Sequence, residues 1–390
     1  MGTDVSSFKE AYRTPISSNF PDSVTIRIGT EVFNYGAVNY PLRYGTNPHQ
    51  PFMAYKPLWN PFLSIGGLEM LKGGKSGLSL TNIQDMSQAW QTLKYFDRPA
   101  VTLMKHLNPC GFDLDHDLEL LEIQGSRGLA EAYRSARGCD ERSAFGAVAG
   151  FNRKVDARTA EALMETFIEC VIAPDYEPEA LEILRKNEGT KKLNNSLRVA
   201  KAGNLDRIPK FIGDNTKGFY NLRVLADGTL TIEEPYLTRI KSVADFVTDP
   251  MIVREVGGAP QNYTALTQPT SKQLQDGLTA WRLVIQTRSN GIIFVKNDRA
   301  IAVGTGEQER VGAVEQAIDK ARKKGHSLEG AVMASDAFFP KRDCIDEVAK
   351  HKVGGVVWPA GSLGDWETIQ AANEHGIALM ATLERCFAHH

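Results

Sequence analysis

Short apolar runs alternate with longer amphipathic stretches along most of this 390-residue chain. The runs have the length of strands, and the stretches between them place apolar residues on one helical stripe. Such an alternation predicts sheets whose faces are covered by helices, which is an α/β fold. The chain is too long for one ordinary core, so we expect two or three packed units.

The expected elements form two similar series, although no clean sequence repeat proves a duplication. The strands are expected at 24–28, 101–104, 147–151, 170–173, 291–295, 300–304, 330–334, 355–358 and 377–381. Helices are expected at 81–96, 129–137, 157–167, 307–324 and 366–374, and a further helix is expected to begin after Asp343. Asp343 would cap the start of that helix, and Gly376 would end the helix at 366–374. The predicted division is an N-terminal extension over 1–40, a first unit over 41–185, a connector region over 186–265 and a second unit over 266–390.

Composition excludes several classes of protein. Hydrophobic residues make up 42% and charged residues 24% of the chain, as in ordinary globular proteins. The net charge of −2 gives no electrostatic reason to expect a nucleic-acid partner. The five cysteines are far apart, which fits a reducing cytosol rather than a disulfide framework. No apolar run is long enough to cross a membrane, so we expect a cytoplasmic protein without a membrane partner.

The pair Lys105-His106 stands out because it ends the apolar run 101–104. The following Leu107-Asn-Pro-Cys-Gly111 is expected to be a loop. Ligands of α/β folds bind where strands exit into loops, and this pair would bring a fixed cation and a general base there. Taken alone, the pair is more simply interpreted as a surface lysine beside a half-buried histidine.

Three partial motifs fail at a required position. Gly73-Gly-Lys-Ser76 resembles a phosphate loop, but Glu69 stands where that motif needs glycine. Gly304-Thr-Gly306 opens a helix, but Glu309 replaces the third glycine of a dinucleotide fingerprint. Pro109-Cys110 lacks the second cysteine of a zinc deaminase. The sequence therefore gives no support to an ATP, dinucleotide or zinc site.

Several segments in order resemble one family, from about residue 40 to the C-terminus. They are Leu42-Arg-Tyr-Gly-Thr-Asn-Pro-His-Gln50, Lys105-His106, Ser143-Ala-Phe-Gly146, Ile172-Ala-Pro174, Ser289-Asn290, Gly304-Thr-Gly-Glu-Gln-Glu-Arg310, Ser335-Asp-Ala-Phe-Phe-Pro340 and Arg385-Cys-Phe387. The chain resembles the formyltransferase domain of the bifunctional purine-biosynthesis protein that also carries inosine monophosphate (IMP) cyclohydrolase. Because residues 1–40 are too few to hold that second domain, a stand-alone transformylase is expected.

The resemblance implies a reaction and an architecture. The formyl group of 10-formyltetrahydrofolate would pass to the amine of 5-aminoimidazole-4-carboxamide ribonucleotide (AICAR), giving the formamido nucleotide (FAICAR) and tetrahydrofolate. The resemblance further implies two cytidine-deaminase-like three-layer α/β units and a homodimer with shared active sites. It implies no zinc, and a separate IMP cyclohydrolase would consume the product.

The resemblance also assigns roles to individual residues. His106 would accept the proton of the amine, and Lys105 would stabilise the oxyanion. The AICAR contacts would be Arg43, Tyr44, His106, Gly146, Glu169, Asn290, Arg310, Phe338 and Arg385. The folate contacts would be Val311, Pro340, Asp343, Ser362 and Leu363, and a potassium ion is possible near Thr287, Ser289 and Asp336.

Some assignments compete with other roles, and some positions depart from the family. Phe338 could instead pack in a core, since one of the two adjacent phenylalanines must do so, and Asp343 could cap its helix. Lys341 replaces an aromatic residue near the folate, and Gly291 replaces a serine of the cation loop. Two other functions stay open, namely formylation of AICAR from formate and ATP, and a non-catalytic subunit that binds AICAR beside a cyclohydrolase.

Overall fold

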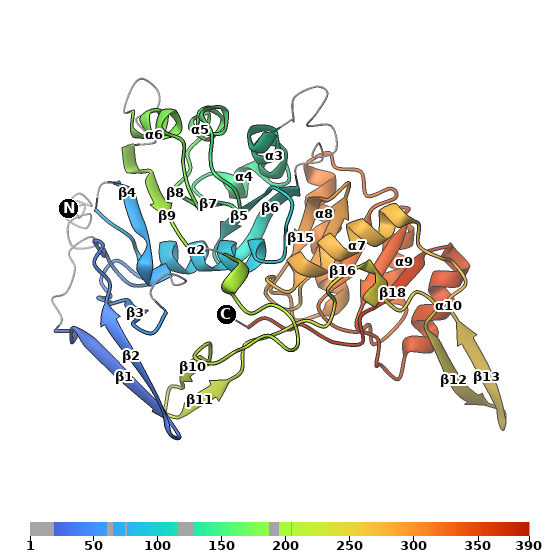
Figure 1. Ribbon diagram of the computed structural model, residues 1–390. Helices are drawn as coiled ribbons and strands as arrows, with labels where there is room; N and C mark the ends of the chain where they lie inside the picture. Colours follow the sequence, from blue (N-terminus) through green and yellow to red (C-terminus); the bar gives the residue numbers. More distant parts are fainter. Residues whose placement is uncertain are drawn as a thin grey trace, which may run out of the picture. The chain divides into compact units, whose positions relative to one another are not determined.

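The computed structural model describes residues 19–60, 65–74, 76–114, 128–186, 195–203 and 205–389. The chain divides into two compact units (Figure 1). Unit 1 comprises Met1–His106, Gly125–Arg134 and Arg142–Ile208, and unit 2 comprises Leu107–Gln124, Ser135–Glu141 and Pro209–His390. An α/β fold is confirmed for both units, which we describe separately. No helix in the described part of the chain is long and apolar enough to cross a membrane.

Unit 1 is built on five strands of a mixed sheet and on a small antiparallel sheet. The five strands follow the order β5-β7-β8-β9-β4, with β5 Ala100–Lys105, β7 Val148–Phe151, β8 Cys170–Ala173, β9 Arg198–Lys201 and β4 Glu69–Gly73. The small sheet contains β1 Ser23–Ile28, β2 Glu31–Ala37 and β3 Tyr55–Pro57. In Figure 1, α2 lies on one side of the mixed sheet, and α5 and α6 lie on the other. The helices and turns are α2 Leu80–Leu93, α5 Ala157–Met164, α6 Pro178–Arg185, η1 Ile65–Gly67 and η3 Leu205–Arg207, while α3 Gly128–Arg137 and α4 Glu141–Ala144 run across the unit boundary.

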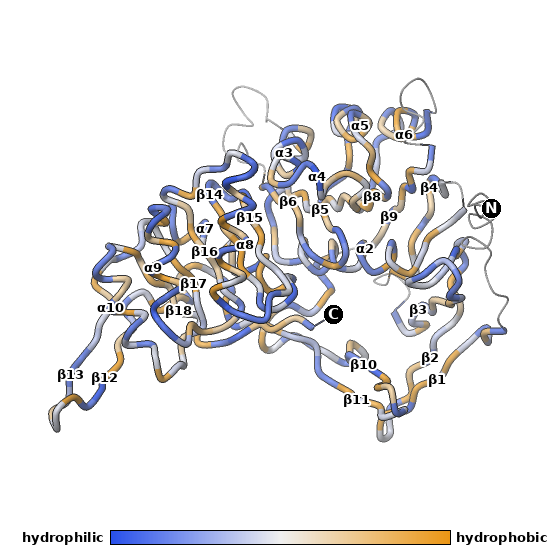
Figure 2. The backbone as a smooth tube through the Cα atoms, turned by 180° about the vertical axis from the view of Figure 1, so that it is seen from behind, coloured by the Kyte–Doolittle hydropathy of each residue, from blue (hydrophilic) through white to orange (hydrophobic). Residues whose placement is uncertain are grey.

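Unit 2 is built on six strands of a mixed sheet, in the order β18-β17-β16-β14-β15-β6. Its strands are β6 Asn108–Leu114, β14 Ile292–Lys296, β15 Arg299–Gly304, β16 Val332–Ser335, β17 Gly355–Trp358 and β18 Ala378–Ala381. Its helices are α7 Ser271–Val284, α8 Arg310–Lys323, α9 Asp343–Ala349, α10 Asp365–His375 and the short η4 Val243–Asp245. Figure 2 shows apolar residues concentrated along the central strands, and Phe294, Phe339 and Trp358 are fully buried in the core of this unit.

Two hairpins of unit 2 lie outside its sheet. They are β10 Asn221–Val224 with β11 Leu230–Glu233, and β12 Met251–Val256 with β13 Ala259–Thr264. The second hairpin projects from the unit beside α10 (Figure 1). Both hairpins fall in the range 186–265 that was expected to connect the units, as does β9, which pairs with β8 and β4. The predicted domain boundaries stay a prediction.

The order of elements in the first half of the chain recurs in the second half. The series α2-β5-β6-α3-β7-α5-β8-α6-β9, with the four-residue α4 added before β7, corresponds to α7-β14-β15-α8-β16-α9-β17-α10-β18. The pairings correspond as well, because β5 and β7 are antiparallel like β14 and β16, and the two pairs that follow are parallel in each unit. The similarity of the two halves, which no sequence repeat proves, is therefore confirmed at the level of topology.

The expected loop after Lys105 is wrong. His106 and Leu107 form a two-residue turn with φ of 54° and 66°, and β6 begins at Asn108. Such tight turns normally contain Asn or Gly, which adopt positive φ readily, so His-Leu carries no turn signal. The turn formers Asn108 to Gly111 lie inside the strand instead.

Other local predictions have mixed outcomes. The hairpin turn at Asn297 and Asp298 is confirmed, with φ of 57° and 56°, and Gly376 closes α10 with φ of 68°. The helix cap predicted at Asp343 is wrong, because Arg342 occupies the N-cap position and makes no side-chain cap hydrogen bond. Asp343 is the first residue of α9 and accepts a hydrogen bond from the Cys344 amide at 2.8 Å.

Candidate active site

Lys105 and Gly146 lie side by side in unit 1. The Lys105 ammonium donates a hydrogen bond to the carbonyl of Phe145. Gly146 has a φ of 72°, and its amide donates to the carbonyl of Phe167 at 2.8 Å. A Cβ atom on Gly146 would lie 3.2 Å from the Phe167 ring and 3.8 Å from the Lys105 Nζ. The structure therefore brings together two residues that the sequence assigns to the same site.

His106 is exposed and has left-handed backbone geometry, with a φ of 54°. This conformation costs a residue with a Cβ atom about 1–2 kcal/mol. Residues held in such conformations cluster at functional sites, where the surrounding structure imposes them. The tight turn after β5 thus presents the imidazole directly after the anchored Lys105.

Arg43 and Tyr44 are held by the residues at the start of α2 and just before it. The Arg43 amide donates to the Leu78 carbonyl at 2.8 Å, and the Leu80 amide donates to the Tyr44 carbonyl at 2.9 Å. The Arg43 guanidinium lies 4.7 Å from the centre of the Tyr44 ring. These backbone hydrogen bonds therefore fix the main-chain positions of Arg43 and Tyr44, and the Tyr44 ring stabilises the Arg43 guanidinium through a cation–π contact.

Glu169 is paired with an arginine that sequence reasoning missed. Its Oε1 lies 3.3 Å from Nη1 of Arg198, which is 2% exposed, whereas the Glu169 side chain is 34% exposed. Arg198 lies in the apolar run 197–200, where a single charged residue was the only signal that could have identified it. A buried guanidinium needs such an anionic partner.

The predicted residues of unit 2 centre on a buried ion pair. Arg310 and Asp336 are paired through Nη1 and Oδ1, with side chains 8% and 0% exposed. The other oxygen of Asp336 accepts from the Ser289 hydroxyl, and the Arg310 Nη2 donates to the Asn290 Oδ1 at 2.5 Å. Asn290 in turn donates to the carbonyls of Glu307 and Gln308, both at 2.9 Å. Asn290 and Arg310, both assigned to AICAR, are therefore in direct contact.

The C-terminal segment is tied to the same cluster. The Cys386 amide donates to the Asp336 carbonyl at 2.9 Å, and the Ser289 amide donates to the Ala388 carbonyl at 3.0 Å. Arg385, between these anchors and the preceding strand, is exposed and lies 4.8 Å from the Phe387 ring centre. Phe338 is 39% exposed and Phe339 is fully buried, so one of the two belongs to the core, as predicted.

Four of the five predicted folate residues lie on two loops that touch. Pro340 and Asp343 precede or begin α9, and Ser362 and Leu363 precede α10. A Cβ atom on Gly364 would lie 2.5 Å from the Pro340 carbonyl oxygen, so the loops approach closely there. Leu363 is 98% exposed, and the fifth residue, Val311, is partly buried against the core of unit 2.

Two carboxylates stabilise these loops. Asp365 is buried, and its Oδ2 accepts from the Gly361 and Ser362 amides at 2.6 and 3.1 Å. Burial raises the pKa of Asp365, and the two amide hydrogen bonds act against that rise. Asp346 of α9 binds Arg342 through both oxygens and also binds His375 of α10, and these hydrogen bonds, those with Arg342 first, lower the pKa of Asp346 to about 2.

Comparison with known proteins identifies the family. A family model described as AICARFT/IMPCHase bienzyme matches residues 7–320. The chain is 36% identical over 349 residues to the bifunctional purine biosynthesis protein PurH of Persephonella marina, covering 89% of this chain and 59% of that protein. It is 35% identical over 376 residues to PurH of Caldicellulosiruptor saccharolyticus, covering 95% and 62%.

The chain belongs to the AICARFT/IMPCHase bienzyme family. It spans about three fifths of the length of these PurH relatives. A solved structure of a deaminase/reductase from Thermotoga maritima aligns with a TM-score of 0.24 at 24% identity, over 28% of this chain and 37% of that chain, and supports no argument.

The potassium site predicted for this AICARFT/IMPCHase chain stays a prediction. The Thr287 hydroxyl donates to the Leu283 carbonyl at 3.1 Å, and Asp336 is engaged by Ser289 and Arg310. Within the described ranges, no group of three or more His, Cys, Asp or Glu side chains could hold a metal ion, although potassium is usually bound by carbonyl and hydroxyl oxygens, which such a group does not include.

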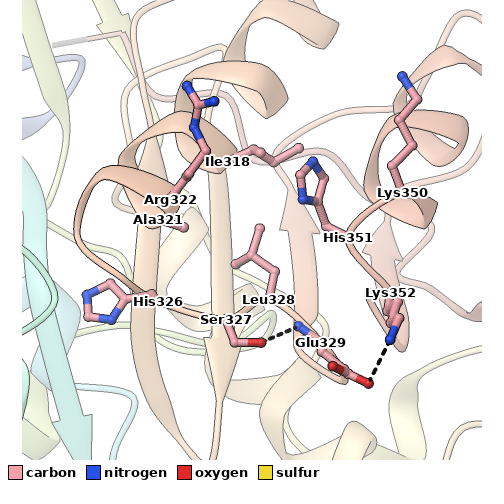
Figure 3. A pocket seen from close by; sticks show the side chains of 10 residues that line it. All are labelled: Ile318, Ala321, Arg322, His326, Ser327, Leu328, Glu329, Lys350, His351 and Lys352. Carbon is pink, nitrogen blue, oxygen red and sulfur yellow. Dashed lines mark hydrogen bonds and ion pairs between the residues drawn. The ribbon is translucent and has the colours of Figure 1, made fainter.

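A pocket of about 270 Å³ lies in unit 2, away from the residues assigned to AICAR and folate (Figure 3). It is lined by the end of α8, by residues 326–329 and by residues 350–352. Lys352 at its rim pairs with Glu329 at 3.4 Å. None of the residues assigned to AICAR or folate lines this pocket, so it is not the predicted site.

Gly146→Ala tests the close packing beside Lys105 in this AICARFT/IMPCHase chain. The added methyl group meets the Phe167 ring in a left-handed residue, so we expect about 1–2 kcal/mol of destabilisation. We also expect weaker AICAR binding, because the backbone that anchors Lys105 must shift. Urea unfolding and AICAR titration check both effects, with Gly213→Ala as the control, since Gly213 has a positive φ but no neighbour within 4 Å. Wild-type affinity in Gly146→Ala would contradict the assignment.

Proposed function

We propose that the chain transfers the formyl group of 10-formyltetrahydrofolate to the 5-amino group of AICAR, giving FAICAR and tetrahydrofolate in purine biosynthesis. Family membership supports the proposal together with one structural observation. That observation is the anchored Lys105 beside Gly146, followed directly by the exposed, left-handed His106.

The chemistry calls for a base near the attacking amine and for a cation near the oxygen of the formyl group. The amine of AICAR is conjugated with a carboxamide, so it is a weak nucleophile that must lose a proton as it attacks. An imidazole is basic near neutral pH, which suits His106 as proton acceptor. Lysine has three N–H donors, and Phe145 accepts from Lys105, which orients the ammonium while donors remain for an oxyanion.

The other ligands follow from their chemistry. A guanidinium binds phosphate through two parallel hydrogen bonds, which suits Arg43 and Arg385. A carboxylate accepts from ribose hydroxyls, which suits Glu169 on its solvent side. Asn290 and Arg310 would contact the base or carboxamide, Tyr44 and Phe338 the nucleotide, and the two loops around Pro340 and Leu363 the folate.

Wider features of the function are part of the same proposal. The recurrence of one α/β series supports two cytidine-deaminase-like units. We further propose a cytoplasmic homodimer with shared active sites and a potassium ion near Thr287, Ser289 and Asp336. Transfer of a formyl group to so weak an amine is unfavourable alone, so an IMP cyclohydrolase would draw the reaction forward by cyclising FAICAR.

A reconstituted assay of the purified chain tests this function. With AICAR and 10-formyltetrahydrofolate but no ATP, we expect FAICAR and tetrahydrofolate to form in equal amounts, measured by chromatography. A parallel reaction with formate and ATP should give no FAICAR. Turnover that demands formate and ATP would contradict the proposed donor, and AICAR binding without turnover in either reaction would favour a non-catalytic subunit.

A further inference from the structure

Arg198 joins two separate segments of unit 1 that carry proposed nucleotide ligands. It begins β9, and its side chain is 2% exposed. Its Nε donates to the carbonyl of Gly77 at 2.5 Å. Its Nη1 donates to the Glu169 Oε1 at 3.3 Å and to the Ser196 carbonyl at 3.2 Å. One buried guanidinium thus binds the chain just before α2 and the carboxylate just before β8.

The Gly77 contact leads directly to Arg43. Gly77 has a φ of 79°, and a Cβ atom on it would lie 2.3 Å from the Pro41 carbonyl oxygen. The next residue, Leu78, donates to that same carbonyl at 3.0 Å and accepts from the Arg43 amide at 2.8 Å. Any shift of the Gly77 carbonyl therefore moves the backbone that carries Arg43.

The Glu169 contact fixes a carboxylate that is only partly covered. Arg198 holds one oxygen from the protein side, while the side chain is 34% exposed. The Glu169 carbonyl also accepts a hydrogen bond from the Arg198 amide at 3.0 Å, so both the backbone and the side chain of Glu169 are bound by Arg198. With about a third of its side chain exposed, Glu169 stays accessible to a ligand hydroxyl.

We propose that Arg198 is a positioning residue that sets the separation between Arg43 and Glu169 for a ribose 5-phosphate. This inference rests on the proposed function. The phosphate and the ring hydroxyls of a ribonucleotide are separated by a limited range of distances. A protein therefore gains affinity when the side chains that bind them, here Arg43 and Glu169, are already held at a matching separation. The planar fork of arginine has fixed donor directions and can bind carbonyls and a carboxylate at once, whereas a lysine presents one point charge on a flexible stem.

Arg198→Lys separates positioning from a merely structural role. Losing charge-assisted hydrogen bonds should weaken AICAR binding about tenfold to a hundredfold, measured by calorimetry. We expect KM for AICAR to rise correspondingly, while kcat at saturating AICAR stays near the wild-type value because Phe145 anchors Lys105 independently. Arg153→Lys is the control at an exposed arginine of the same unit, whose guanidinium donates to the carbonyls of Asn152 and Asp97, and this variant should bind AICAR normally.

Glu169→Gln, which leaves Arg198 unchanged, gives a second test and completes a double-mutant cycle with Arg198→Lys. Because Arg198 acts partly through Glu169, the combined loss of affinity should be smaller than the product of the two single losses. Wild-type AICAR affinity in Arg198→Lys, or a fully multiplicative cycle, would overturn the inference while leaving the proposed function intact. A wild-type chain that neither binds nor formylates AICAR would overturn the proposed function and this inference with it.

Discussion

His106→Asn is expected to lower kcat for formylation of AICAR by about 10²–10⁴-fold, the usual contribution of a general base. Asparagine is chosen because it adopts the left-handed conformation that His106 has, with a φ of 54°, at little cost. The amide is not basic, so the proton of the attacking amine has no acceptor at this position. Single-turnover kinetics with saturating AICAR and 10-formyltetrahydrofolate measures the chemical step.

The controls for this variant separate chemistry from binding and folding. AICAR affinity should change far less than kcat, because Arg43, Tyr44 and Glu169 are held by contacts that do not involve His106. His351→Asn, at a half-buried histidine beside the pocket in unit 2, should keep full activity. A His106→Asn enzyme with near wild-type kcat would remove His106 from the role of base, and loss of AICAR binding alone would make it a ligand instead.

Much of the fold was predictable because its signals are local. The run before Lys105, the stripe of α2 and the turn at Asn297 and Asp298 are patterns that neighbouring residues generate by themselves. The tight turn at His106 and Leu107 carries no such signal, so the sequence predicts a loop where the structure has β6. The positive φ of His106 is imposed by tertiary structure, and no propensity encodes it.

Motif resemblance assigns residues to the candidate site, and this assignment stays a prediction, but resemblance does not indicate which partners hold those residues. Motif resemblance identifies Glu169 and Arg310, since their side chains are of the types that a nucleotide requires. Their partners, Arg198 and Asp336, are 29 and 26 residues away along the chain. Contacts over such separations depend on how the strands assemble into sheets. Only the structure therefore reveals that Glu169 and Arg310 are each paired with a buried charge.

Arg310→Met is expected to lower the free energy of unfolding of unit 2 by about 3–5 kcal/mol, the cost of breaking a buried ion pair on one side. Asp336 is fully buried, so removal of the guanidinium leaves a carboxylate whose remaining side-chain partner is the Ser289 hydroxyl. Urea unfolding followed by tryptophan fluorescence measures the loss, because Trp281 and Trp358 are both fully buried in unit 2. Arg322→Met is the control, since Arg322 is 74% exposed and its pair with Asp319 should contribute little.

The companion change Asp336→Asn decides whether the loss comes from the unpaired charge. An amide in place of the carboxylate removes the charge while it can still contact Ser289, so Arg310→Met with Asp336→Asn should be more stable than Arg310→Met alone. The double variant should nevertheless bind AICAR poorly, because Asn290 loses the donor that holds its Oδ1 at 2.5 Å. Stability that recovers without affinity would show that this cluster holds the fold through Asp336 and binds the nucleotide through Asn290 and Arg310. Equal recovery of both would remove Arg310 from the nucleotide site, and no recovery of stability would mean that the guanidinium acts through its other contacts.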